Sequence, residues 1–213
     1  MTLAQKCFIA VAGNIGAGKS TLTHRLSDAL NWQPFFEASA ENPYLADFYA
    51  DMQRWSFHSQ VFYLGRRLEH HRLLVDHQGC AVQDRTVYED AEIFARNLYE
   101  SNLMSERDYD AYRHLYVAVS SFLPPPDLII YLEASVETLV QHIAKRGRDY
   151  ERDIQTDYLA RLNRYYEDWI GNWTRCPVLR VNVDGIDFAE NAADFANIVA
   201  AVEAVLPAAS TTQ

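Results

Sequence analysis

The sequence predicts an α/β domain in three layers, with a five-stranded parallel sheet flanked by helices. Two observations support this fold class. Short apolar runs alternate along the chain with segments whose apolar residues recur at helical spacing. The first apolar run also leads through a glycine-rich turn straight into a helical segment, as in a parallel strand–helix unit. The length of 213 residues fits one domain, which we place at 1–206, followed by a frayed tail at 207–213.

Five apolar runs are the expected strands: residues 7–12, 33–37, 80–84, 128–132 and 178–183. In open parallel sheets, ligands bind beyond the carboxyl ends of the strands. The first run ends in the glycine turn, the second on Glu37 and the third on Asp84-Arg85. We therefore expect these three strand ends to share one rim.

The segments between the strands carry helical periodicity, and the expected helices cover residues 21–30, 44–51, 55–75, 88–100, 108–122, 135–145, 158–173 and 188–206. Ser105 opens a capping-box pattern, and Ser135 is the expected N-cap of the sixth helix. Gly79 ends the long third helix, and three prolines at 124–126 stop the fifth. These boundaries place a helix after every expected strand.

The composition describes an acidic globular protein with a net charge of −10, which argues against a nucleic-acid partner. No run is long enough to span a membrane, and we recognise no signal peptide. The three cysteines are far apart, so we expect reduced packing residues. Together these features predict a cytoplasmic enzyme with no membrane partner.

The turn after the first strand matches G-x-x-x-x-G-K-[ST], the phosphate-binding P-loop. Its glycines let backbone N–H groups surround an anion, and the helix N-terminus adds partial positive charge. Lys19 would reach the outer phosphates of ATP, and Ser20 would ligate Mg²⁺. The expected nucleotide-binding residues here are Gly13, Asn14, Ile15, Gly16, Ala17, Gly18, Lys19, Ser20 and Thr21.

Several further blocks follow in order: Asn42-Pro43-Tyr44, Arg54-Trp55-Ser56-Phe57, Asp84-Arg85-Thr86, Ile93-Phe94-Ala95 and Arg146-Gly147-Arg148. With the P-loop, this set resembles the deoxynucleoside kinase family almost from end to end, and most resembles its bacterial deoxyadenosine kinase branch. The resemblance implies a P-loop kinase fold and ATP-dependent 5′-phosphorylation of a deoxynucleoside in nucleotide salvage. It also implies a homodimer formed by the helices at 55–75 and 108–122.

A kinase that acts on a sugar hydroxyl needs a proton acceptor and charge neutralisation. Glu37 is the expected base, and Arg85 can donate a planar fork to the transferring phosphate. We expect Lys19 to complete this catalytic set and Asp84 to hold Mg²⁺ through water. The resemblance implies that Arg146 and Arg148 belong to a lid near 142–153 that closes over the phosphates. At His142, where some relatives carry arginine, we assign no catalytic role.

Base recognition is expected from Gln60, Asp90 and Arg67. The Gln60 amide offers an acceptor and two donors, so it does not choose a base alone. Asp90 only accepts hydrogen bonds, which favours bases with an exocyclic amine. Arg67 lies seven residues after Gln60, on the same helix face, and can form an ion pair with Asp90. Adenine or cytosine fits this trio better than thymine, and guanine stays open.

For the sugar, the resemblance implies 3′-hydroxyl contacts from Tyr49 and Glu151. Two alternatives stay open. A nucleoside monophosphate kinase would need further arginines for the acceptor phosphate, but no arginine follows Glu37 closely. A non-catalytic nucleotide-binding subunit of the same fold is disfavoured because Lys19, Ser20, Glu37 and Arg85 are all present.

Overall fold

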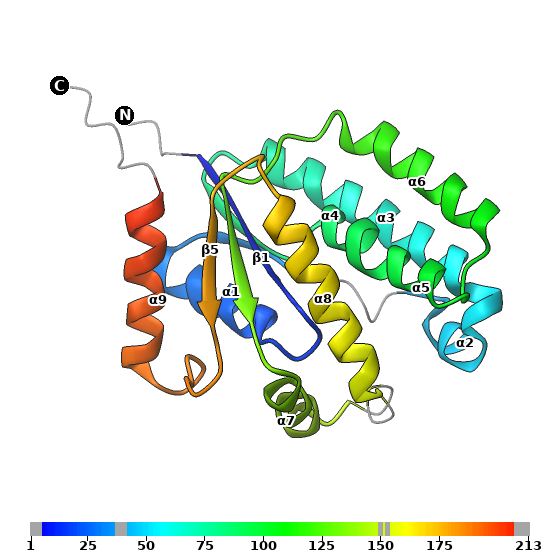
Figure 1. The fold of residues 1–213 in the computed structure, drawn as a ribbon. Coiled ribbons are helices and arrows are strands. Elements are labelled where there is room, and N and C mark those ends of the chain that lie inside the picture. Colours follow the sequence, from blue (N-terminus) through cyan, green and yellow to red (C-terminus); the bar gives the residue numbers. More distant parts are fainter. Residues whose placement is uncertain (1–5, 37–41, 149–150, 152–153, 207–213) are drawn as a thin grey trace.

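The computed structural model describes residues 6–36, 42–148, 151 and 154–206, and Figure 1 shows their arrangement. One five-stranded sheet has the order β2-β3-β1-β4-β5, and every neighbouring pair is parallel. The strands are β1 Cys7–Gly13, β2 Gln33–Phe35, β3 Cys80–Asp84, β4 Leu128–Glu133 and β5 Val178–Asn182. The predicted fold class is therefore confirmed.

The helices match the expected positions to within a few residues. They are α1 Lys19–Leu30, α2 Leu45–Ala50, α3 Met52–Asp76, α4 Val87–Glu89, the π-helix η2 Asp90–Ala95, α5 Arg96–Glu100, α6 Glu106–Ser120, α7 Val136–Arg146, α8 Thr156–Asn172 and α9 Ala192–Val205. The expected N-caps are confirmed: Ser105 accepts from the Asp108 amide, and Ser135 accepts from the Thr138 amide, each at 3.2 Å. The single helix expected over 88–100 is instead interrupted by a π-helix, whose wider turn no apolar periodicity announces.

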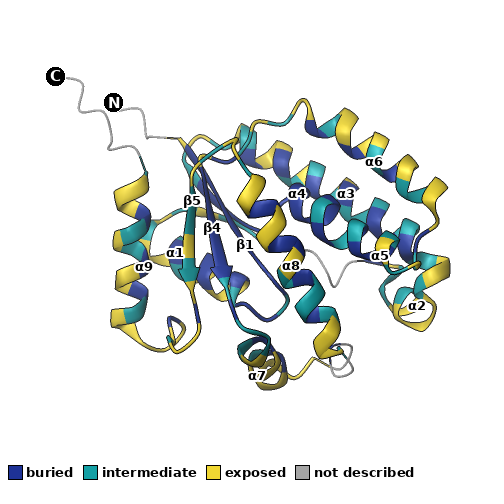
Figure 2. Ribbon diagram, in the orientation of Figure 1, coloured by how far each residue is buried: buried dark blue, intermediate teal, exposed yellow. Residues whose placement is uncertain are grey.

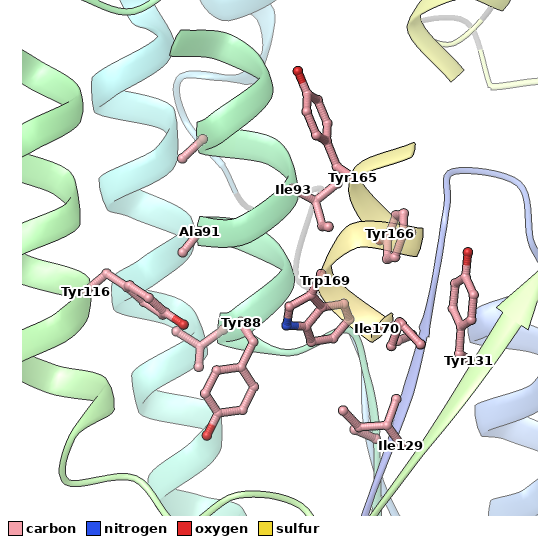
Figure 3. Packing of buried hydrophobic residues seen from close by; sticks show 14 of the residues in the cluster. Tyr88, Ala91, Ile93, Tyr116, Ile129, Tyr131, Tyr165, Tyr166, Trp169 and Ile170 are labelled. Carbon is pink, nitrogen blue, oxygen red and sulfur yellow. The ribbon is translucent and has the colours of Figure 1, made fainter. Parts of the chain in front are cut away.

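Strand β1 is completely buried because both of its faces are covered. Phe8, Ala10 and Ala12 pack with α3, α4, α6 and α8, whereas Ile9 and Val11 pack with α1, α7 and α9. Figure 2 shows β1 and β4 in the dark blue of buried residues, between helices whose outer faces are in the yellow of exposed residues. Figure 3 shows how Trp169 and Ile170 of α8 meet Ile129 of β4 on the first of these faces. The sheet is thus the middle of three layers, which leaves its carboxyl edge open for ligands.

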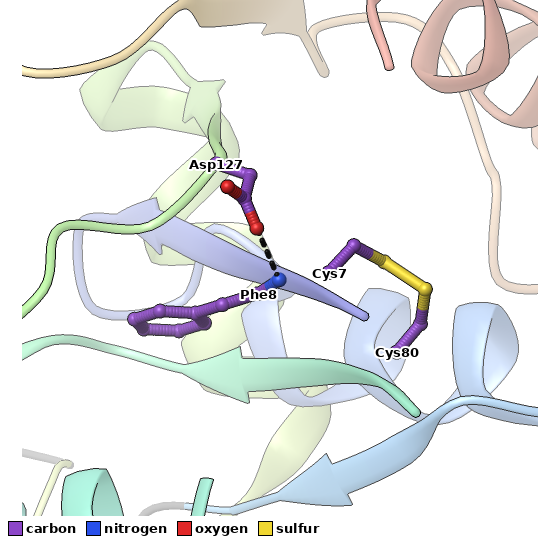
Figure 4. Close-up of a disulfide and its surroundings, with 4 residues drawn as sticks. All are labelled: Cys7, Phe8, Cys80 and Asp127. Carbon is purple, nitrogen blue, oxygen red and sulfur yellow. Dashed lines mark hydrogen bonds between the residues drawn. A yellow bond between two sulfur atoms is a disulfide. The ribbon is translucent and has the colours of Figure 1, made fainter. Parts of the chain in front are cut away.

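Cys7 and Cys80 form a disulfide, so the expectation of three reduced cysteines is wrong for this pair (Figure 4). The two residues are direct register partners on β1 and β3, with Cα atoms 4.3 Å apart. Because 73 residues separate them in the sequence, only the strand register reveals their contact. Cys176 is free and half-buried.

Some expectations concern residues that the structure does not describe. Glu37, part of the lid and the tail at 207–213 lie outside the described residues, and β2 is seen to end at Phe35. Within the ranges that the structure describes, no helix combines the length and apolar character that a bilayer crossing requires.

Candidate active site

The P-loop runs from the end of β1 into α1. Gly16 and Gly18 adopt φ angles of 86° and 96°, which side-chain-bearing residues rarely adopt. There is also no room for a side chain: a Cβ on Gly18 would lie 2.7 Å from the Phe188 ring, and one on Gly16 would lie 2.9 Å from the Leu139 carbonyl oxygen. The glycines therefore let the loop turn tightly and deliver the N-terminus of α1 to the rim.

Polar contacts hold this loop in place. The Lys19 ammonium is buried and donates to the Asn14 carbonyl oxygen at 2.9 Å. The side-chain amide nitrogen of Asn14, Nδ2, donates to the Leu159 carbonyl oxygen at 2.9 Å and to Asn163 Oδ1 at 2.7 Å. These two hydrogen bonds connect the loop to α8. Of the predicted nucleotide-binding residues of this loop, those that line the cavity are Ile15, Gly16, Gly18, Lys19, Ser20 and Thr21.

Ser20, in the first turn of α1, meets Asp84 at the end of β3. The Ser20 hydroxyl donates to Asp84 Oδ2 at 2.5 Å. The other carboxylate oxygen, Oδ1, is buried and has no hydrogen-bond partner within the described part of the chain. A hydroxyl and a carboxylate are hard oxygen donors of the kind that Mg²⁺ prefers. The residues present therefore fit a magnesium ion, although no group of three or more His, Cys, Asp or Glu side chains gathers within the described ranges to hold a metal.

Arg85 follows β3 directly and is held in a left-handed conformation, with φ of 67°. Its amide donates to the Val11 carbonyl oxygen at 3.0 Å, which fixes the turn against β1. Its guanidinium lies 4.3 Å from the centre of the Phe94 ring and donates to the Tyr166 hydroxyl at 3.2 Å. The side chain is 5% exposed and lines the same cavity as Lys19. A cation therefore stands beside the P-loop where phosphates would lie.

At the other end of the cavity, the ion pair predicted between Arg67 and Asp90 is confirmed. Arg67 Nε donates to Asp90 Oδ2 at 3.0 Å, and a second nitrogen donates to the Asp84 carbonyl oxygen at 3.3 Å. Asp90 and Gln60 line the cavity, and Arg67, which is not among the lining residues, contacts Asp90. The buried Gln60 Oε1 has no hydrogen-bond partner among the described residues. These groups can accept hydrogen bonds from a flat polar ligand.

The lid residues are paired with each other. Helix α7 ends at Arg146 because Gly147 adopts a left-handed φ of 69°. Arg146 Nε donates to Glu151 Oε2 at 3.0 Å, and Arg148 lies 3.5 Å from Glu151 Oε1. Glu151 is 5% exposed, and all three residues line the cavity. The family resemblance implied that these arginines contact the phosphates and that Glu151 contacts the sugar. It did not predict that the three residues pair with each other.

The cavity has a volume of about 910 Å³ and spans from the P-loop to α3. One end is lined by the P-loop, α7 and residues 186–190, and the other by α2, α3 and η2. Tyr49 lines the second end and is 39% exposed. Phe36, the last described residue before Glu37, also lines the cavity. Cationic groups lie at the first end and hydrogen-bond acceptors at the second, so the cavity can hold a polyphosphate and a nucleoside together.

The sequence assigned no role to His142 and did not point to several other residues of the site. A ring nitrogen of His142 on α7 is hydrogen-bonded to the Gly16 carbonyl oxygen at 2.8 Å. Tyr158 lines the cavity, and burial raises the pKa of its hydroxyl to about 12. Glu89 accepts from the Gly13 amide, where the P-loop starts, and from the Tyr166 hydroxyl. Tyr166 in turn accepts from Arg85. Only Glu89 had a readable local signal, since Thr86-x-x-Glu89 is a capping-box pattern.

Comparisons with known proteins identify the family of this chain. The model of the deoxynucleoside kinase family matches residues 9–207. A deoxyadenosine/deoxycytidine kinase of Bacillus subtilis is 36% identical over 206 residues, which are 96% of this chain and 95% of that protein. A deoxyguanosine kinase of the same organism is 34% identical over 203 residues, 93% of this chain and 97% of that protein.

Among solved structures, deoxyadenosine kinase from M. mycoides with the products dCMP and dCDP superimposes with a TM-score of 0.83 at 31% identity. The match covers 93% of this chain and all of that one. The family model matches most of the chain, the similarity runs along nearly its whole length, and the fold is shared. This chain therefore belongs to the deoxynucleoside kinase family.

Proposed function

We propose that the protein transfers the γ-phosphate of ATP to the 5′-hydroxyl of deoxyadenosine, with deoxycytidine or deoxyguanosine as further substrates. The observation that carries this proposal is the two-ended cavity. Lys19 and Arg85 lie toward the phosphate end, and Gln60 and Asp90 lie at the base end. The similar Bacillus subtilis protein is named a deoxyadenosine/deoxycytidine kinase, which supports the choice of base.

The base preference follows from hydrogen-bonding chemistry. Asp90 forms a buried ion pair with the Arg67 guanidinium, and a carboxylate offers only acceptor oxygens. Adenine presents a 6-amino donor for Asp90 and an adjacent N1 acceptor for the Gln60 NH₂ group. Cytosine offers an equivalent pair in its 4-amino group and N3. Thymine presents no amino group, so its carbonyl would face the carboxylate and weaken binding.

At the phosphate end, each residue has one task. Lys19 and the N-terminus of α1 neutralise the outer phosphates, while Ser20 and Asp84 would hold Mg²⁺. The ion, when bound, supplies further positive charge for the transferring group. Arg85 stabilises charge that develops on the phosphoryl oxygens. Glu37 accepts the proton of the 5′-hydroxyl, and Arg146 and Arg148 add cations from the lid.

The sugar and the oligomer complete the proposal. Tyr49 and Glu151 contact the 3′-hydroxyl, which requires Glu151 to release at least part of its pairing with the lid arginines.

The protein forms a homodimer through α3 and α6, which expose the apolar residues Leu73, Leu115 and Val117. Light scattering on the purified protein measures the mass and would give that of one chain if the dimer proposal is wrong.

A substrate panel tests the base preference. With ATP and Mg²⁺, deoxyadenosine should give the highest kcat/KM among the four deoxynucleosides and adenosine. A preference for thymidine would contradict the roles of Gln60 and Asp90, and a preference for deoxyguanosine over both deoxyadenosine and deoxycytidine would contradict the proposed choice of base. Lys19→Ala is the control that reports background turnover.

The proposed base is tested separately. Replacing Glu37 with Ala should lower kcat by about 10²-fold or more, as loss of a general base does, and leave nucleoside binding largely intact. Turnover at the wild-type rate in this variant would remove Glu37 from the mechanism without affecting the family assignment. The two alternatives drawn from the sequence, a monophosphate kinase and a non-catalytic subunit, are set aside because the family assignment favours neither.

A further inference from the structure

One buried carboxylate near the phosphate end has no task in the proposed mechanism. Glu89 of α4 is 0% exposed. Its Oε2 accepts from the Thr86 amide at 2.8 Å and from the Thr86 hydroxyl at 3.2 Å. Its Oε1 accepts from the Tyr166 hydroxyl at 2.9 Å and from the Gly13 amide at 3.4 Å. A buried carboxylate is costly unless donors surround it, so these four contacts explain how it is tolerated, but not why it is there.

Tyr166 connects this carboxylate to Arg85. The Tyr166 hydroxyl donates to Glu89 and accepts from the Arg85 guanidinium at 3.2 Å. Burial raises the pKa of this hydroxyl well above its usual value, so it keeps its proton at neutral pH and acts as donor to Glu89. Its ring lies flat against Tyr131, with centres 5.7 Å apart and planes at 16°. The hydroxyl is therefore held in one place by packing and by two polar partners.

We propose that Glu89 and Tyr166 are positioning residues that orient the guanidinium of Arg85 toward the transferring phosphate. This inference rests on the proposed role of Arg85. The Phe94 ring supports the guanidinium at 4.3 Å, and the Tyr166 hydroxyl fixes one of its nitrogens, which together restrict rotation of a long side chain. Orientation matters because a fork donor is effective only when its N–H groups point at the oxygens.

The neutral hydroxyl between Glu89 and Arg85 has a physical advantage. A carboxylate in direct contact with Arg85 would compete with phosphate for its N–H groups. Through Tyr166, Glu89 instead orients the hydroxyl dipole, whose oxygen faces Arg85. The contact with Gly13 adds a second effect, since the same carboxylate joins the end of β1, where the P-loop starts, to the turn after β3.

The test is the single-turnover rate of phosphate transfer from labelled ATP to deoxyadenosine, which follows slow variants as well as fast ones. Tyr166→Phe should lower this rate by about tenfold, the effect of losing a hydrogen bond to a charged group. The affinities for ATP and deoxyadenosine should stay within about twofold, because the hydroxyl contacts neither ligand in the proposal. Circular dichroism and thermal unfolding check that the variant folds.

Tyr131→Phe is the matched control. It removes a hydroxyl from the ring stacked on Tyr166, but that hydroxyl donates to Glu167 at 3.0 Å, away from Arg85. Its transfer rate should equal that of the wild type. A wild-type rate in Tyr166→Phe, or an equal loss in both variants, would overturn the positioning role.

A double-mutant cycle separates this inference from the proposed function. If Tyr166 acts through Arg85, then Tyr166→Phe should change the rate by less than about twofold in an Arg85→Lys background. A full tenfold loss in that background would show that Tyr166 does not act through Arg85. If Arg85→Lys itself transfers phosphate at the wild-type rate, the proposed role of Arg85 fails first. Phosphorylation by the wild-type protein is measured independently of both results.

Discussion

Removing the guanidinium of Arg67 should destabilise the protein far more than removing that of its neighbour Arg66. The Arg67–Asp90 pair spans 3.0 Å, and its side chains are 3% and 6% exposed. The Arg66–Glu69 pair spans 2.7 Å on the same helix, but its side chains are 33% and 51% exposed. Methionine is a suitable replacement at both positions, because it is unbranched and matches arginine in helix propensity. The two variants therefore differ mainly in the burial of the partner left behind.

The expected magnitudes follow from that difference. Arg67→Met takes the guanidinium away from the buried Asp90 carboxylate, and breaking a buried ion pair in this way costs about 3–5 kcal/mol of unfolding free energy. Arg66→Met breaks a solvated pair, which is worth less than about 1 kcal/mol. The Asp84 carbonyl oxygen also loses a donor in the first variant, which adds to its cost. Urea unfolding followed by circular dichroism, at one protein concentration and pH 8, measures both values.

A second substitution checks the cause. Adding Asp90→Asn to Arg67→Met removes the buried charge that lost its guanidinium and should recover at least about 1 kcal/mol. Equal losses in the two arginine variants, with unchanged denaturant slopes, would refute the reasoning. So would a double variant as unstable as Arg67→Met alone, because the loss would then come from packing.

Three further predictions concern other parts of the molecule. Burial lowers the pKa of His71 from 6.5 to about 4, so between these pH values the unfolded chain binds a proton that the folded protein does not bind. The unfolding free energy should therefore fall by about 2 kcal/mol from pH 7 to pH 5. His71→Gln should remove that part of the pH dependence, measured by urea unfolding. Gly65→Ala should raise the unfolding free energy by about 0.5–1 kcal/mol, since a Cβ there would meet no described atom within 4 Å in the middle of α3; a loss would indicate that this face is covered. Asp84→Asn should raise the Mg²⁺ concentration for half-maximal activity severalfold, because a neutral amide is a weaker ligand, and an unchanged requirement would remove Asp84 from the metal site.

Much of the candidate site was predictable because its signals are local. The P-loop needs glycines at set positions before a helix, and eight consecutive residues carry that requirement. The ion pair between Arg67 and Asp90 was expected because helical spacing placed Arg67 on the same side as Gln60. Ser20 and Asp84 were both expected to serve Mg²⁺, from the P-loop pattern and the family resemblance, and the structure places the two side chains in contact.

Other features had no local signal. The pairing of Arg146 and Arg148 with Glu151 depends on how the chain turns after α7. The π-helix at 90–95 breaks a pattern that reads as an ordinary helix. The Tyr166–Glu89 contact joins residues 77 positions apart. In the sequence alone, Tyr166 is typical of a core aromatic residue and Glu89 of an acid at the start of a helix, so neither predicts the contact.

The amino-acid sequence by itself determined the alternation of strands and helices, the anion-binding turn and the kind of chemistry at each strand end. These depend on periodicity and turn stereochemistry within about ten residues. Only the tertiary structure decided the strand order β2-β3-β1-β4-β5, the disulfide between Cys7 and Cys80 and the orientation of Arg85 by Tyr166 and Glu89. The physical reason is that such contacts depend on strand register and helix packing, which bring together side chains that no short stretch of sequence relates.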